Sequence, residues 1–374
     1  NTVTGQGLTY TAVSPISSTG QAGSVFPTTT FTVTKANNIL SGTAVITGLP
    51  AGITSTQSYN NTNTDNILTI TLSGVYPSAN SVGTNLVISG LTVVATLLID
   101  YLIIAGGGGG GSNQNAGGGG AGGYRNSFAS ESSGGGSASE TPIIITPSSN
   151  YLVTIGAGGA GGVATSNAGT NGDNSIFYNI ISTGGGGGGY NMAGNGSNGG
   201  SGGGQGYASS GSPGSAVTSP VVQGYGGGTG ASQASNYGGG GGGGAGSLGQ
   251  NGGGSQGNGG AGLASSITGV SVVRASGGSG GANSIQPVAT PGGGAIPGSN
   301  AVDNTGGGGG GGSNLPSTLS DGTNGGSGIV TLRYPDNYSM TVGAGLVTGV
   351  LNQAVGAAEK YTTFTAGTGN IQFS

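Results

Sequence analysis

The sequence contains no cysteine, no histidine and no tryptophan, and only 4% of its 374 residues are charged. Without cysteine the chain has no disulfide, thiolate nucleophile or cysteine-based zinc site. Without histidine it lacks the commonest general base and metal ligand. Five Lys and Arg against nine Asp and Glu give a net charge of −4, which excludes a basic surface for nucleic acid or anionic lipid. We therefore expect no enzyme, no cofactor and no metal site.

Long apolar runs are also lacking. The longest apolar stretch, residues 91–105, is too short to cross a membrane as a helix and contains Asp100. We therefore expect no insertion into a membrane. The chain begins at Asn1 without an initiator methionine, which is compatible with processing of the N-terminus or with an earlier part that was removed or never included.

Glycine is the abundant residue. It supplies 95 positions, and a flexible linker is the default interpretation of glycine runs, because they offer no side chains to bury. Strongly apolar segments lead into the runs, however, as at Leu97–Ala105 and Ser175–Thr183. Disordered chains lack such segments, so we predict that the runs are ordered. The unbroken runs are Gly106–Gly111, Gly184–Gly189, Gly238–Gly244 and Gly306–Gly312.

Ordered glycine runs can form extended left-handed helices with three residues per turn and no internal hydrogen bonds. Such helices can pack side by side and hydrogen-bond to one another, and only glycine fits where a helix is surrounded. Pure runs are then central, and mixed tracts such as Gly199–Gly206 and Gly252–Gly260 lie at the edge. A collagen helix is excluded, because it needs strict Gly-X-Y repeats with abundant proline.

Composition divides the chain into three regions. Residues 1–96 alternate β-branched and polar residues between turn signals, which predicts an immunoglobulin-like β-sandwich. Residues 97–335 form the glycine-rich bundle, fed by short β-strands. Residues 336–374 predict a small C-terminal β unit with a turn at Gly367–Gly369. The predicted fold class is all-β plus a polyglycine II helix bundle, with essentially no α-helix.

The sequence motifs that usually indicate a catalytic or nucleotide-binding site are weak evidence in this chain. G-x-G-x-x-G arises by chance in so much glycine, and the G-x-S-x-G matches have no histidine to activate the serine. A depolymerase with two carboxylates stays open as an alternative. Asp173 and Asp321 are interpreted as turn-capping residues, with Ca²⁺ binding as the alternative. Arg125, Arg274 and Arg333 stand at strand–glycine junctions. Each is interpreted as part of a local ion pair or as a surface cation, with capping of carbonyl groups at the ends of the helices as the alternative.

Tyrosines beside glycine tracts, with amide residues nearby, are the most suggestive candidates for binding. Aromatic rings with amides suit the recognition of sugars or protein surfaces, although each ring could simply cover a glycine backbone. If strands lie at the base, residues 112–116, 163–170 and 190–198 point outward as tip loops. The candidate receptor-contact residues are Ser112, Asn113, Gln114, Asn115, Tyr190, Asn191, Asn195, Tyr207, Tyr225 and Tyr237.

Several segments resemble the glycine-rich domain of bacteriophage tail-fibre and adhesin proteins. They are Asp100–Arg125, Tyr151–Gly162, Ser182–Gly189 and Gly325–Pro335, within about residues 97–335. The resemblance implies a virion protein near the host-contacting end of a fibre, with loops at the tip of a polyglycine II bundle gripping a receptor. The N-terminal sandwich departs from the usual tail-fibre attachment domain.

These observations predict a non-enzymatic viral structural protein at a virion or extracellular surface. The implied partners are a host cell-surface receptor (a glycan or outer-membrane protein), other virion or filament subunits and further copies of the chain. The alternative is a secreted subunit of an extracellular filament, sheath or capsid decoration. Its strand-like ends, Val3–Val13 and Tyr361–Phe373, would exchange between subunits. Ice binding through a flat bundle face is a third hypothesis.

Overall fold

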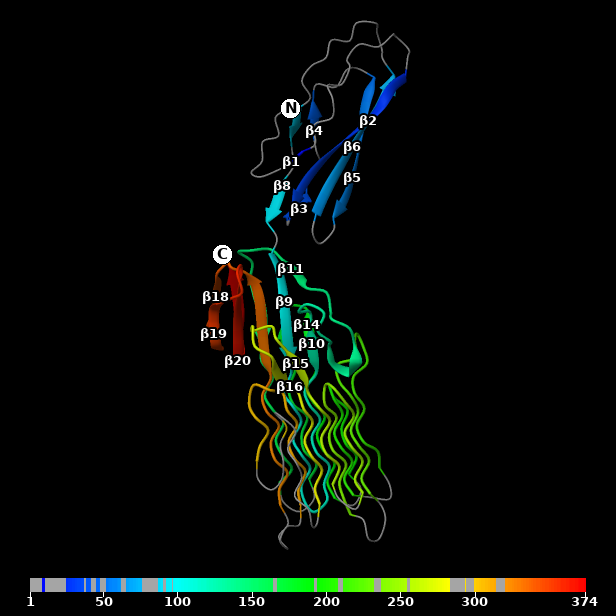
Figure 1. Cartoon of the computed structure of the whole chain (residues 1–374), viewed down its shortest axis with the longest axis vertical. Helices are drawn as coiled ribbons and strands as arrows, with labels where there is room; N and C mark the ends of the chain where they lie inside the picture. The colour runs from blue at the N-terminus through cyan, green and yellow to red at the C-terminus, as the bar shows by residue number, and fades with distance from the viewer. Residues whose placement is uncertain are drawn as a thin grey trace. The chain divides into compact units, whose positions relative to one another are not determined.

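The chain divides into two compact units, Asn1–Leu97 with Ile144–Pro147 and Leu98–Ile143 with Ser148–Ser374 (Figure 1). Within the residues that the structure describes there is no α-helix, and one 3-10 turn spans Gly134–Gly136, so the predicted fold class is confirmed. The computed structural model describes residues 9–10, 25–36, 38–41, 45–47, 52–61, 65–75, 87–89, 92–95, 97–163, 167–191, 194–207, 211–231, 237–253, 256–282, 293, 299–313 and 320–374.

The first unit consists of antiparallel strands. Its main sheet has the order β1-β2-β6-β5, and β3-β8 and β4-β7 form two smaller sheets. Leu68, Ile70 and Leu72 on β6 are fully buried and alternate with half-buried threonines, as expected for a strand with one face in a core. The strands are β1 (Thr9–Tyr10), β2 (Val25–Ala36), β3 (Asn38–Ser41), β4 (Val45–Thr47), β5 (Ile53–Asn61), β6 (Asp65–Val75), β7 (Val87–Ser89) and β8 (Thr92–Ala95).

The second unit contains a ten-stranded sheet. Its main path has the order β10-β9-β17-β20-β12-β13-β14, and β18 and β19 also pair with β20. The hairpin β15-β16 stands apart from this sheet. The strands are β9 (Leu97–Ile104), β10 (Tyr124–Asn126), β11 (Ile143–Ile145), β12 (Tyr151–Thr154), β13 (Ser175–Phe177), β14 (Ile180–Ser182), β15 (Leu263–Ser265), β16 (Val272–Arg274), β17 (Ile329–Pro335), β18 (Met340–Val342), β19 (Leu346–Val355) and β20 (Glu359–Phe373).

The C-terminal residues 336–374, which composition sets apart, belong to the same compact unit as the glycine bundle. The reason lies in β20. Its first half pairs with β17 and its second half with β12, while β19 and β18 line its other side. A strand paired on both sides is an interior part of its sheet. The predicted turn at Gly367–Gly369 is therefore part of one continuous strand and not the loop of a hairpin.

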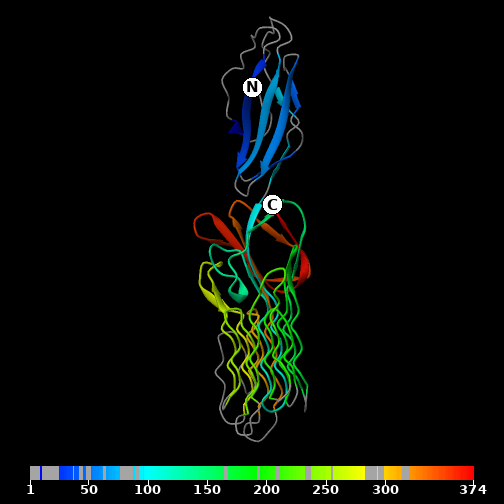
Figure 2. The same ribbon diagram turned by 90° about the vertical axis from the view of Figure 1, so that its right-hand side faces the viewer.

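Below this sheet, glycine-rich runs extend side by side and form a bundle (Figures 1 and 2). We call the end at the strands the sheet end and the opposite end of the bundle the far end. Residues 105–112, the central run, continue β9 outward, and residues 116–123 return to β10. The turn between them lies at the far end, as predicted for residues 112–116.

The central run shows how the glycines are ordered. Its amides donate in rotation to three neighbouring runs, residues 167–174, 320–328 and 116–123. Its carbonyl groups accept from three further runs, residues 183–190, 155–163 and 306–312. Every third residue meets the same neighbour, which is the repeat of a polyglycine II helix. For residues 106–111 in order, the acceptors are the carbonyl oxygens of Asp173, Gly326, Gly120, Thr170, Thr323 and Gly117, at 2.9 to 3.1 Å.

Amide side chains extend the same pattern at the edge of the bundle. Asn171 Oδ1 accepts from the Gly187 amide at 2.9 Å, and Asn174 Oδ1 accepts from the Gly184 amide at 2.8 Å. Because Asn171 and Asn174 are three residues apart in a helix with three residues per turn, both side chains lie on the same side of the helix. Asp173, between them, lies within this straight run and not in a turn, because its backbone bonds to neighbouring runs. Its interpretation as a turn-capping residue is therefore wrong.

Candidate functional site

Five of the predicted contact residues come together at the far end, where they form what we call the far-end cluster. The Tyr207 amide donates to the Asn115 carbonyl at 2.9 Å. The Tyr207 and Tyr237 rings meet edge to face, with centroids 4.8 Å apart and planes at 76°. The run that ends at Tyr190 bonds to the runs that end at Tyr207 and Asn115. The far-end cluster consists of Asn115, Tyr190, Asn191, Tyr207 and Tyr237.

The turn at residues 112–115 is built by its own polar side chains. Asn113 and Asn115 have φ of 75° and 58°, in the left-handed region that asparagine tolerates better than most residues. The Asn113 Oδ1 accepts from the Gln114 amide at 2.7 Å. Ser112 is fully buried, and its hydroxyl bonds to the backbone of Asn167. Ser112 thus serves the bundle, while Asn113 and Gln114 are half-buried.

Two amide oxygens of the far-end cluster are buried without a partner. Asn115 is 2% exposed and Asn191 6% exposed. Within the part of the chain that the structure describes, neither Oδ1 atom accepts a hydrogen bond. A buried acceptor left unpaired costs about 1–3 kcal/mol, which makes it a candidate for ligand contact.

Two further predicted candidates, Asn195 and Tyr225, stand outside the cluster. Asn195 is exposed at the edge of the bundle near the far end, since the carbonyl of the adjacent Gly194 accepts from the Gly206 amide. Its Oδ1 accepts from the Ser212 amide at 2.8 Å. Tyr225 lies near the sheet end, because its amide donates to the Gly244 carbonyl two residues before the bend at Gly246. Asn195 therefore lies beside the far-end cluster with its side-chain oxygen already paired, whereas Tyr225 lies away from the cluster.

Charge is distributed unevenly along the second unit. The cations of residues 97–374 are Arg125, Arg274, Arg333 and Lys360, and all four belong to strands at the sheet end. Asp321 is the charged residue described at the far end, next to Ser320, whose carbonyl accepts from the Asn113 amide. The sequence segments 164–166, 192–193, 208–210, 232–236, 283–298 and 314–319 contain no Asp, Glu, Lys or Arg.

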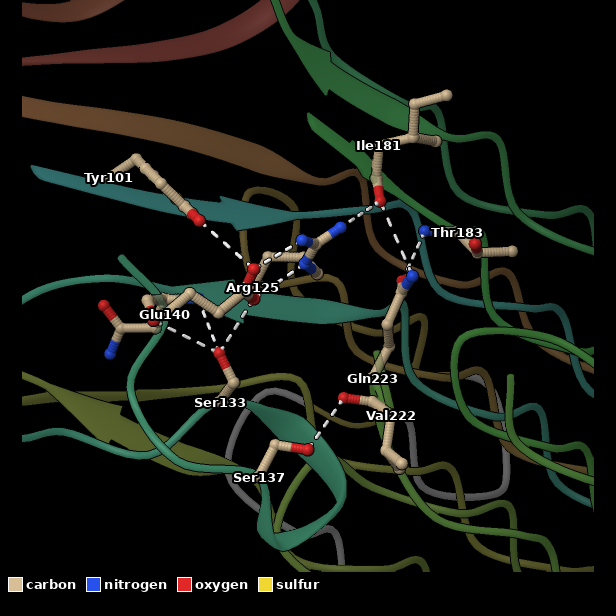
Figure 3. A network of polar contacts seen from close by, with 10 residues as sticks. Tyr101, Arg125, Ser133, Ser137, Glu140, Ile181, Thr183, Val222 and Gln223 are labelled. Atoms are coloured by element: carbon tan, nitrogen blue, oxygen red, sulfur yellow. Dashed lines mark hydrogen bonds and ion pairs between the residues drawn. The ribbon is translucent and has the colours of Figure 1, made fainter. Parts of the chain in front are cut away.

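A polar network at the sheet end surrounds Arg125 (Figure 3). Arg125 forms a buried ion pair with Glu140 and donates to the Ile181 carbonyl at 3.0 Å. The Tyr101 hydroxyl donates to the Glu140 carboxylate at 3.1 Å, and the Ser133 hydroxyl donates to the same carboxylate at 3.0 Å. Burial first, and then the negative charge of Glu140, raise the pKa of Tyr101 above its ordinary range. The network joins β10 to β14, the two ends of the main path of the sheet.

The predicted ion pairs are confirmed for two of the three arginines. Arg333 pairs with Glu359 and donates to the Ile267 carbonyl at 3.1 Å, so it also caps a carbonyl group, as Arg125 does. Arg274 makes no ion pair with the carboxylates of the described residues. Burial, the largest cause, lowers its pKa. These networks hold strands together.

The described residues contain no group of three or more His, Cys, Asp or Glu side chains placed to hold a metal ion. Among these same residues, no helix has the length and apolar character needed to span a membrane.

Comparison with known families supplies the identity of the bundle. A family model described as a glycine-rich domain matches residues 81–335, which confirms the resemblance to such a domain; its phage context stays a prediction. Comparison with curated proteins and with solved structures returns no match. Because the matched residues make up more than half of the 374-residue sequence, the chain belongs to the family of glycine-rich domains.

Proposed function

We propose that this chain is a non-enzymatic adhesin component of a phage tail fibre, which attaches to a host surface through the far end of its glycine bundle. The observation that carries the proposal is the far-end cluster, where aromatic and amide side chains gather on a hydrogen-bonded glycine scaffold. Its partners are a receptor on the host cell and other subunits of the virion, and its location is the virion surface.

The scaffold supports the proposal because it fixes the binding residues in advance. In the central run every amide from Ala105 to Asn113 donates to a neighbour. Loops held by such a scaffold lose less conformational entropy on binding than loops on a flexible stalk. Several copies on one particle would add avidity to a modest affinity at each site.

The alternative, a filament assembled by strand exchange, has less support. Tyr361–Phe373 lies in β20, which is paired on both sides and has no free edge to offer a neighbour. In the other proposed end, Thr9–Tyr10 pairs with β2, and the rest of Val3–Val13 lies outside the described residues.

Adhesion of the purified chain to a panel of bacterial strains tests the proposal. The double variant Tyr207→Ala/Tyr237→Ala removes the ring pair of the far-end cluster. We expect it to lose adhesion by about tenfold or more, as for the loss of anchor side chains in an interface. Tyr178→Ala is the matched control, because Tyr178 is 50% exposed at the sheet end.

Two results would contradict the proposal. One is adhesion that disappears in Tyr178→Ala and persists in the double variant, which would place binding at the sheet end. The other is a wild-type chain that adheres to no strain and assembles into continuous filaments under electron microscopy.

A further inference from the structure

The chemistry of the far-end cluster narrows the kind of ligand that it can take. The cluster contains no cation, and the Arg and Lys residues of the second unit lie at the sheet end. An anionic ligand would find no opposite charge there, and a cationic ligand would find only Asp321. Electrostatic steering, which needs clustered charge, cannot contribute much to binding. The ligand that fits such a surface is uncharged.

Hydrogen bonding gives the ligand a second property. The polar atoms left over in the cluster, Asn115 Oδ1 and Asn191 Oδ1, are acceptors in side chains at least nine-tenths buried. A ligand that satisfies them must donate hydrogen bonds. Hydroxyl groups are uncharged donors that can also accept, and they suit a site with few charges.

Ring geometry gives a third property. Because the Tyr207 and Tyr237 planes meet at 76°, the pair forms an apolar corner with one ring face and one ring edge. Both tyrosines are half-buried, so part of each ring is accessible. A ligand with flat C–H surfaces between its hydroxyl groups would pack against this corner while its hydroxyls bond to the amides.

We infer that the far-end cluster binds a neutral carbohydrate, with pyranose C–H faces on the Tyr207–Tyr237 corner and hydroxyl groups donating to Asn115 and Asn191. This inference rests on the proposed function and specifies its receptor. A protein receptor is the other outcome that the test must distinguish.

A printed array of neutral, sialylated and sulfated oligosaccharides, probed with the full chain, provides the direct test. We expect capture by neutral glycans and not by the acidic ones. Asn115→Gly removes one acceptor and should lower capture about tenfold, the effect of one lost hydrogen bond in a buried site. Asn113→Gly is the matched control, because both residues have positive φ and the Asn113 oxygen is occupied by the Gln114 amide.

Strains that adhere to the chain provide a second test. Periodate, which cleaves sugar diols, should abolish adhesion, while treatment of the cells with proteinase should leave it intact. Adhesion should change by less than about twofold between low and high salt, because no charge pair is screened. Tyr207→Ala/Tyr237→Ala and Asn191→Ala should weaken both array capture and cell adhesion.

The outcomes separate the inference from the proposed function. Cell adhesion that proteinase removes and periodate spares, with no capture on the array, would overturn the carbohydrate and leave the adhesin in place. Capture confined to sialylated or sulfated glycans, or equal capture by Asn115→Gly and wild type, would also overturn it. A chain that binds neither cells nor glycans would overturn the proposed function as well.

Discussion

At the scale of single residues, the central run leaves no room for a side chain. A Cβ atom on Gly109 would overlap the carbonyl group of Ala160, and one on Gly108 would overlap that of Gly186. These contacts are with backbone of neighbouring runs, which is itself bound into the bundle. Glycine is required here by close approach on all sides and not by an unusual φ, since positive φ is not found in residues 106–111.

Gly109→Ala tests this packing. We expect a loss of about 1–3 kcal/mol in the free energy of unfolding, because the inserted methyl group forces neighbouring backbone apart. Gly253→Ala is the matched control, since nothing lies within 4 Å of a Cβ at Gly253. There the change should be neutral or stabilising by about 0.4–1 kcal/mol. Denaturant unfolding of both variants measures the difference; equal losses would refute the packed bundle.

The two ion pairs offer a second comparison of single residues. Glu140→Ala leaves Arg125 charged and 7% exposed, and breaking such a buried pair costs about 3–5 kcal/mol. Glu359→Ala breaks a pair whose carboxylate side chain is 40% exposed, so a loss of about 1 kcal/mol or less is expected. Calorimetric unfolding of both variants measures which of the two substitutions lowers stability more. A larger loss for Glu359→Ala would mean that the Arg125 network does not hold β10 and β14 together.

At the scale of elements, each helix of the bundle depends on the runs beside it, because a polyglycine II helix makes no internal hydrogen bonds. At the edge of the bundle, an asparagine or aspartate side chain accepts the backbone amide in place of a backbone carbonyl. The pairs Asn195 with Asn198 and Asn300 with Asp303 repeat the spacing of Asn171 with Asn174. A side chain therefore completes the bundle where the backbone cannot.

Removal of one of these amides tests its contribution. Asn171→Ala leaves the buried amide of Gly187 without its acceptor, which should cost about 1–3 kcal/mol. Amide hydrogen exchange at Gly187 should accelerate, while exchange at Gly184, held by Asn174, should not. Asn150→Ala, at an exposed position, is the control. Unchanged exchange at Gly187 would show that the side chain is dispensable.

Elements were predictable where the sequence changes character abruptly. The apolar segment that becomes β9 ends where the glycine run begins, so both strand and run could be predicted from their residues. The position of Tyr225 near the sheet end could not be predicted in this way. The chain bends at residues 200–201 inside the mixed tract Gly199–Gly206, without a strand to mark the reversal. Beyond such a bend, sequence does not reveal whether a run leads toward the sheet end or the far end.

The edge asparagines and the far-end cluster were beyond sequence reasoning for a related reason. Residues far apart in the chain meet there, and which runs become neighbours depends on packing of the whole bundle. Asn171 and Asn174 are three residues apart in the sequence, but this spacing becomes meaningful only once the three-residue repeat of the helix is known.

At the scale of the whole molecule, ionisable groups are few and concentrated at the sheet end. Burial would raise the pKa of Glu131, but hydrogen bonds from Ser265, Ser266 and Asn126 outweigh it and lower that pKa. Burial raises the pKa of Tyr124 and Tyr334 above the ordinary tyrosine value. The sequence contains no histidine to titrate near neutral pH.

These shifts predict a broad plateau of stability. Glu131 stabilises the fold above the carboxyl pKa of the unfolded chain, and this contribution is lost as the pH falls below about 4. The buried tyrosines stabilise it below about pH 10, the pKa of unfolded tyrosine, and that contribution is lost at higher pH. Tm measured by calorimetry should therefore be flat from about pH 6 to 9. A transition near pH 7 would contradict this, and Tyr124→Phe should weaken the alkaline decline.

The position of each residue in the central run determines which neighbouring run its amide bonds to. These neighbours repeat every third residue. One glycine inserted within residues 105–112 would therefore rotate all later residues of the run by a third of a turn, so that each later amide would face a different neighbouring run. An insertion in a turn between two runs, as after Gln114, leaves the hydrogen-bond partners within each run unchanged. The length of each run is therefore fixed by its hydrogen bonds to the neighbouring runs, whereas the turns that join the runs carry no such constraint.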